Sequence, residues 1–205
     1  MRRLPLFPLP VVLLPRAALP LHIFENRYRR LMARCIEFDG RFGAIYHDPD
    51  RHGPFLSEEG RVGTVAEIEV FHPLPDGRSL VLVRGRERFS IRDAIDGGEP
   101  YYEALVEEYE DGGPPRGETG ALPARRRRSI DLFHAAVRAV AGEGEGEGDE
   151  APELDPERET AFPLASRLRI DADWLQALLE LRDERARLDR LDAVFQAAVD
   201  RRGRG

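Results

Sequence analysis

Residues 62–95, VGTVAEIEVFHPLPDGRSLVLVRGRERFSIRDAI, decide the fold class of this chain. Residues typical of β-strands fill the ranges 62–74, 79–84 and 87–95. Between the first two ranges, Leu74-Pro75-Asp76-Gly77 predicts a hairpin turn, because proline presets its φ and glycine tolerates a positive φ. The stretch therefore predicts antiparallel β-structure.

The apolar pattern of the two hairpin strands differs. In residues 64–70 apolar side chains alternate with Glu67 and Glu69, which predicts one buried and one exposed face. Residues 80–83 are apolar throughout, as expected of a buried strand in a small closed barrel.

Further strands and one helix surround this hairpin in the sequence. Residues 41–47 and 101–109 also have strand character. A helix is predicted from residue 25 until Gly40, because apolar side chains recur there at helical spacing: Tyr28, Leu31, Met32, Cys35 and Ile36. Burial on that helix would keep the thiol of Cys35, the single cysteine, unreactive.

The apolar amino-terminal stretch, MRRLPLFPLPVVLLPRAALPLHIFE, invites interpretation as an export signal or a membrane anchor. Its five prolines leave no apolar run long enough for either kind of helix. We therefore expect residues 4–14 to form an edge or barrel strand that stays on the protein. Together with the single cysteine, which suits a reducing compartment, this predicts a cytoplasmic protein that does not bind membranes.

The composition excludes several enzyme classes. All 31 basic side chains are arginine, and lysine is absent from the 205 residues. Walker-type nucleotide sites, Ser-Lys hydrolases and Schiff-base enzymes require lysine, which arginine cannot replace because it stays protonated. The net charge of −7 disfavours nucleic acid as a partner.

The strand pattern ends near residue 112, and helical patterns follow. Apolar residues at helical spacing mark a first helix (Ile130, Phe133, Val137 and Val140), and three shorter helices are predicted at 157–168, 173–181 and 184–199. Between the first helix and the three shorter ones, the segment GEGEGEGDE has no apolar side chain to bury. We predict a β domain over residues 1–115 and a helical bundle over 116–205, which contains a disordered acidic linker at 142–152.

Two stretches resemble the substrate-binding domain of the Lon protease family: LPLFPLPVVLLPRAALPLHIFENRYRRLM, residues 4–32, and VGTVAEIEVFHPLPDGRSLVLVRGRERFSI, residues 62–91. The chain looks most like the bacterial proteins in which that domain stands alone. The resemblance extends to residue 109 and weakly to LLELRDERARLDRL, residues 178–191. It departs from the family pattern at Pro10 and at Arg16, where glycine is common, which leaves the first loop's shape open.

The resemblance implies an α+β fold: a PUA-like β pseudo-barrel with a packed helix, followed by a small C-terminal α-helical bundle. It also implies a binding protein for unfolded or partner polypeptides, with a separate protease or ATPase among the candidate partners. No ATPase or peptidase activity is expected, because the chain has neither a Walker lysine nor a catalytic lysine, and we expect no cofactor. RNA binding is the alternative function that a PUA-like barrel suggests.

Candidate site residues follow from exposed apolar segments. The loop 15–24 and the strand end near residue 71 are the candidate polypeptide contacts, through Arg16, Leu19, His22, Phe24, Phe71 and His72. The run His47-Asp48-Pro49-Asp50-Arg51-His52 has metal-ligating side chains, but its spacing matches no metal signature, so we expect a polar loop. No catalytic residue and no metal site is predicted.

Overall fold

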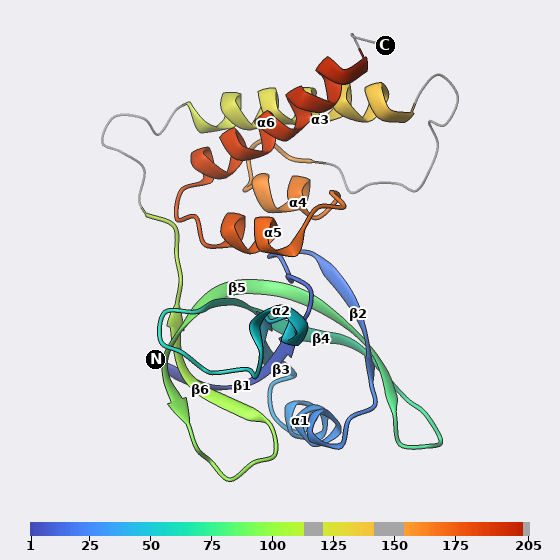
Figure 1. Cartoon of the computed structure of the whole chain (residues 1–205), viewed down its shortest axis with the longest axis vertical. Coiled ribbons are helices and arrows are strands. Elements are labelled where there is room, and N and C mark those ends of the chain that lie inside the picture. The colour runs from blue at the N-terminus through green and yellow to red at the C-terminus, as the bar shows by residue number, and fades with distance from the viewer. Residues whose placement is uncertain (113–120, 142–153, 203–205) are drawn as a thin grey trace. The chain divides into compact units, whose positions relative to one another are not determined.

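The computed structural model describes residues 1–112, 121–141 and 154–202 (Figure 1). The chain forms two compact units: Met1–Glu110 with Ile170–Glu180, and Asp111–Arg169 with Leu181–Gly205. Residues 170–180 thus group with the β unit, although the sequence placed them in the helical bundle. The predicted acidic linker at 142–152 lies outside the described residues.

A six-stranded sheet forms the first unit (Figure 1). Its strands are β1 (Arg2–Leu9), β2 (Ala18–Ile23), β3 (Arg41–Tyr46), β4 (Val62–Pro73), β5 (Ser79–Ile95) and β6 (Tyr102–Glu108). The strand order is β2-β5-β4-β3-β1-β6, and β5 also pairs with β6. The pairing of β5 with β6 closes the run β5-β4-β3-β1-β6 on itself. The strand β2 lies outside this closed run and pairs with β5. With the helices, this confirms the mixed α+β class.

The β4–β5 hairpin turns where the sequence predicts. Gly77 has a φ of +81°, and its N–H donates to the carbonyl of Leu74 at 2.9 Å. The two predicted strands after the turn are one continuous strand, β5, which crosses Gly85. A Cβ at Gly85 would lie 2.2 Å from the carbonyl oxygen of Leu14, so only glycine allows this close approach.

The prediction of a strand buried on both faces at residues 80–83 is wrong. Val81 and Val83 are buried, whereas Leu80 is 48% exposed. This part of β5 lies between β4 and the edge strand β2, and only its inner face joins an apolar cluster. The strands buried on both faces are instead β1 and β3.

The helix α1 (Asn26–Glu37) covers one face of the sheet. Leu31 and Met32 are buried in one apolar cluster with Val81 and Val83. Cys35 is also buried, as predicted, but Ile36 is 48% exposed. A second cluster on the other face of the strands comprises Leu4, Leu6, Ile45, Phe55, Val65, Phe89, Ile91, Ala104 and Val106.

The amino-terminal segment forms β1 only as far as Leu9, and β2 was not predicted from the sequence. In the turn between them Arg16 has a φ of +67°, a conformation that favours glycine. The short helix α2 (Pro49–His52) was also not predicted. The helix α5 (Ala172–Leu179) completes the first unit.

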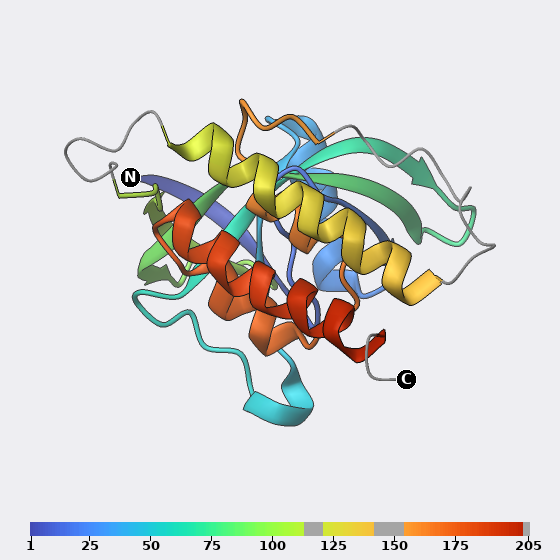
Figure 2. The same ribbon diagram turned by 90° about the horizontal axis from the view of Figure 1, so that it is seen from above.

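The second unit contains α3 (Leu122–Ala141), α4 (Ala161–Ala165) and α6 (Glu184–Arg202). Figure 2 shows α3 and α6 side by side, and the rings of Phe133 and Phe195 meet at 5.4 Å between centroids. Val137 and Val140, predicted on the same apolar face, are exposed. None of the helices that the structure describes is long and apolar enough to cross a membrane.

Candidate functional site

An apolar groove of about 530 Å³ opens on the first unit. The end of β1, the end of β2, the start of α1 and the loop after β3 meet there, and β6 contributes one residue. Its lining includes six large side chains: Phe7, Leu21, Phe24, Tyr28, Phe55 and Tyr102. Segments from five parts of the chain thus build one aromatic surface.

Ring contacts hold the aromatic side chains of the groove in place. Phe7 stacks on Tyr28 at 4.0 Å between centroids, and Phe55 meets Tyr102 edge-on at 4.7 Å. Phe24 is 60% exposed although it is large and apolar. A preformed aromatic surface with an accessible phenylalanine suits the binding of apolar side chains.

Two charged side chains, Glu25 and Arg27, line the groove. Arg27 pairs with Glu25 at 2.8 Å, and its guanidinium lies 4.5 Å from the centroid of the Tyr28 ring. Burial raises the pKa of Tyr28 to about 12, so its hydroxyl stays neutral at physiological pH. The two charged side chains of the lining therefore pair with each other.

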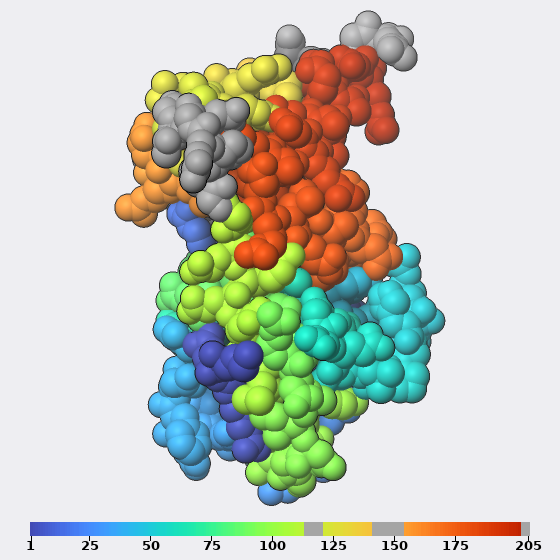
Figure 3. Space-filling model, turned by 90° about the vertical axis from the view of Figure 1, so that its left-hand side faces the viewer, coloured from blue at the N-terminus to red at the C-terminus, as the bar shows by residue number. Residues whose placement is uncertain are grey.

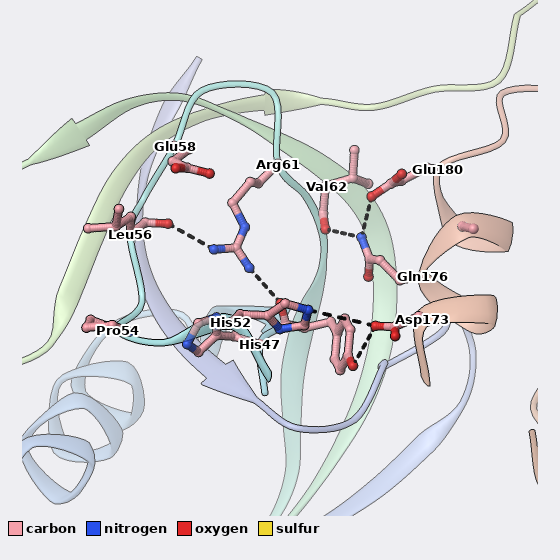
Figure 4. A pocket seen from close by; sticks show the side chains of 12 residues that line it. His47, His52, Pro54, Leu56, Glu58, Arg61, Val62, Asp173, Gln176 and Glu180 are labelled. Atoms are coloured by element: carbon pink, nitrogen blue, oxygen red, sulfur yellow. Dashed lines mark hydrogen bonds and ion pairs between the residues drawn. The ribbon is translucent and has the colours of Figure 1, made fainter. Parts of the chain in front are cut away.

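A second, more polar pocket of about 370 Å³ lies on the same unit (Figure 4). Its walls are the loop after β3 and the helix α5. His47 and Pro54 line both this pocket and the groove, so the two hollows are adjacent. The loop that separates them projects from the surface of the unit (cyan in Figure 3).

Polar contacts fasten α5 to the strands. Asp171 caps the helix by accepting a hydrogen bond from the N–H of Asp173 at 2.9 Å. The hydroxyl of Tyr46 donates to Asp173 at 2.8 Å, and Arg51 pairs with Asp173 at 2.6 Å. Gln176 donates to the carbonyl of Val62 at 3.0 Å. These bonds position the wall of the polar pocket.

The histidine-rich loop has structural contacts. Nε2 of His47 lies 2.8 Å from the carbonyl oxygen of Gly53, and Asp48 caps α2 by accepting from the N–H of Asp50 at 3.0 Å. Nδ1 of His47 is buried without a hydrogen-bond partner in the described part of the chain. Among the described residues no three His, Cys, Asp or Glu side chains gather as a metal site would require.

The structure brings two of the predicted site residues together. His22 and Phe24 line the groove, with their ring centroids 5.7 Å apart. The other four lie outside it: Arg16 is exposed in the turn before β2, Leu19 packs on the apolar cluster under α1, and Phe71 and His72 are exposed on β4.

Sequence reasoning missed most of the groove and pocket residues. Tyr28 was placed only on the apolar face of a helix, and Phe7 only in an apolar strand. Phe55 carried a usable signal, because it is a lone aromatic residue in the polar segment GPFLSEEG. Arg61 carried no such signal, because it is one of the chain's many arginines and only the fold directs its side chain into the polar pocket.

The chain is similar to Lon proteases and to Lon N-terminal domains. A model of the ATP-dependent protease La (LON) substrate-binding domain matches residues 3–192. Lon protease 2 of Herpetosiphon aurantiacus is 29% identical over 96% of this chain, and Lon protease of Escherichia coli is 25% identical over 96%. The chain spans 24% and 25% of those two proteins.

Two solved structures resemble the chain. The Lon N-terminal domain protein from Xanthomonas campestris has a TM-score of 0.62 and 27% identity, covering 94% of this chain and 98% of that one. The N-terminal domain of the Mycobacterium avium complex Lon protease has a TM-score of 0.68 and 18% identity, covering 95% and 98%, and shows the fold alone. The chain belongs to the Lon substrate-binding domain family.

Proposed function

We propose that this chain is a non-enzymatic binding protein that holds apolar segments of unfolded or partner polypeptides in the aromatic groove. The observation that carries the proposal is the open groove lined by Phe7, Phe24, Tyr28 and Phe55. Phe24 is 60% exposed above the more buried rings, and an exposed aromatic ring gains free energy when an apolar side chain displaces water from it. Membership of the Lon substrate-binding family supports the same function. A separate protease or ATPase is the partner that would process the captured polypeptide.

RNA binding, the alternative function, is less well supported, because arginine side chains of the sheet are paired with carboxylates. Arg86 and Arg41 each pair with Glu67 at 2.6 Å, and Arg84 pairs with Glu69. A carboxylate that neutralises an arginine competes with a phosphate for it. These arginines of β3 and β5 are therefore engaged by carboxylates of β4, which argues against a basic RNA-binding face.

The test is fluorescence anisotropy with a labelled, permanently unfolded polypeptide such as reduced and carboxymethylated α-lactalbumin. We expect Phe24→Ser to weaken binding by roughly tenfold, because a phenylalanine contact contributes about 1.5 kcal/mol. Phe38→Ser is the matched control, since Phe38 is 77% exposed and lies outside the groove. Equal losses for the two variants, or binding that falls steeply with salt, would contradict the proposal.

A further inference from the structure

The polar pocket contains an arginine with an unusual set of partners. Arg61 donates to the carbonyl oxygens of Leu56 at 2.9 Å and Tyr46 at 2.7 Å. Its guanidinium also lies 4.8 Å from the centroid of the Phe55 ring. Figure 4 shows this guanidinium pointing into the space that the loop encloses. The cation is therefore held in a defined position beside the groove.

Arg61 forms no ion pair with a carboxylate among the residues that the structure describes. Glu58 and Glu180 lie at the pocket and raise the pKa of Arg61, but the larger effect of burial lowers it. Carbonyl oxygens offer only partial charge, and a guanidinium has more N–H groups than two carbonyls use. The pocket thus holds a half-buried cation with spare N–H groups, which a carboxylate can complement.

The same pocket has hydrogen-bond acceptors that lack donors. Gln176 uses its Nε2 for the carbonyl of Val62 and, at 2.8 Å, for the carboxylate of Glu180. Its Oε1 is buried without a partner in the described structure, as is Nδ1 of His47. A neutral His47 that donates from Nε2 to Gly53 leaves Nδ1 as an acceptor. Such atoms gain most from a ligand that brings N–H groups.

We propose that this pocket binds the C-terminal carboxylate of a polypeptide whose preceding apolar residues occupy the groove, an inference that rests on the proposed function. The terminal carboxylate would pair with Arg61, and a backbone N–H next to it would supply a donor for the acceptors. His47 and Pro54 line both hollows, so a short chain can reach from one to the other. Glu58 and Glu180 repel any anion that enters the pocket, and this repulsion is weaker for a singly charged carboxylate than for a doubly charged phosphate.

The experiment compares three acetylated peptides with the same Leu- and Phe-rich sequence. The first peptide ends in a free carboxylate, and the second ends in a carboxamide. The third ends in a glutamate residue whose C-terminus is a carboxamide, so its carboxylate is on the side chain. Titration into the wild-type chain, followed by anisotropy, needs no mutant and so does not depend on folding of a variant. We expect the free carboxylate to bind about tenfold more tightly than either amide.

Variants then locate the effect. Arg61→Met should abolish the preference for the free carboxylate, whereas Arg78→Met should keep it, since Arg78 pairs with Asp76 in the hairpin turn. Equal binding of all three peptides would overturn this inference and leave the proposed function intact. Stronger binding of the glutamate peptide would overturn the assignment to a chain terminus. Failure of every peptide to bind would refute both proposals.

Discussion

Replacing Glu159 with glutamine should stabilise the helical unit at alkaline pH. Burial, together with the nearby carboxylates of Glu184 and Asp111, raises the pKa of Glu159 to about 7. The N–H of Phe162 donates to Glu159 at 3.0 Å, and Arg187 lies 3.8 Å away, and both oppose the shift. The folded state therefore holds a proton that the unfolded state releases at lower pH.

The sign and size follow from linkage. Because the pKa is higher in the folded state, the free energy of unfolding falls as pH rises from about 4.5 to about 7. Each unit of pKa corresponds to about 1.4 kcal/mol, so a full shift would cost roughly 3 kcal/mol above pH 8. The side chain keeps 28% of its exposure, so we expect about 2 kcal/mol, since solvent screens the charge.

The measurement is urea unfolding at pH 5 and pH 8, with hydrogen exchange in α3 and α6 reporting on this unit. Glu159→Gln keeps an oxygen that can accept from Phe162, so it should exceed wild type by less than about 1 kcal/mol at pH 5 and by about 2 kcal/mol at pH 8. Glu157→Gln is the control, because Glu157 is exposed in the same segment. A difference between Glu159→Gln and wild type that is independent of pH would refute the reasoning.

Two further outcomes test the β unit. Arg16→Gly should raise the free energy of unfolding by about 1 kcal/mol, because Arg16 has a φ of +67° and glycine adopts that conformation without steric cost. Urea unfolding measures this change, and a loss of stability would contradict the prediction. Cys35 should resist alkylation by iodoacetamide at pH 8 until urea is added, because the thiol is buried and burial raises its pKa to about 12. Rapid labelling of the folded chain would contradict this prediction, because it would show that the thiol is accessible.

Local patterns predicted most elements of the β unit. Turn chemistry at Pro75 and Gly77 produced the hairpin, and helical spacing from Tyr28 to Cys35 produced α1. The errors lie where pairing partners decide burial. Residues 80–83 look buried from their composition, but only the face of β5 with Val81 and Val83 joins an apolar cluster, and Leu80 lies on the opposite, exposed face.

The candidate site shows the same division. His22 and Phe24 were predicted from an exposed apolar loop and do line the groove, whereas Phe71 and His72 do not. Strand pairing explains the outcome: His22 on β2 and His72 on β4 are both paired with Leu80, on opposite sides of β5. Of these two strands only β2 lines the groove.

The sequence by itself determined the α+β class, the hairpin, the helix on the sheet and the family, because these depend on spacing, turn residues and motifs within short stretches. Only the tertiary structure decided the groove, the polar pocket and the place of α5. Each of these needs side chains far apart in sequence, such as Phe7, Phe55 and Tyr102, or Arg61 and Gln176, to be brought together. Strand pairing and burial of the apolar clusters make those contacts, and no local pattern records them.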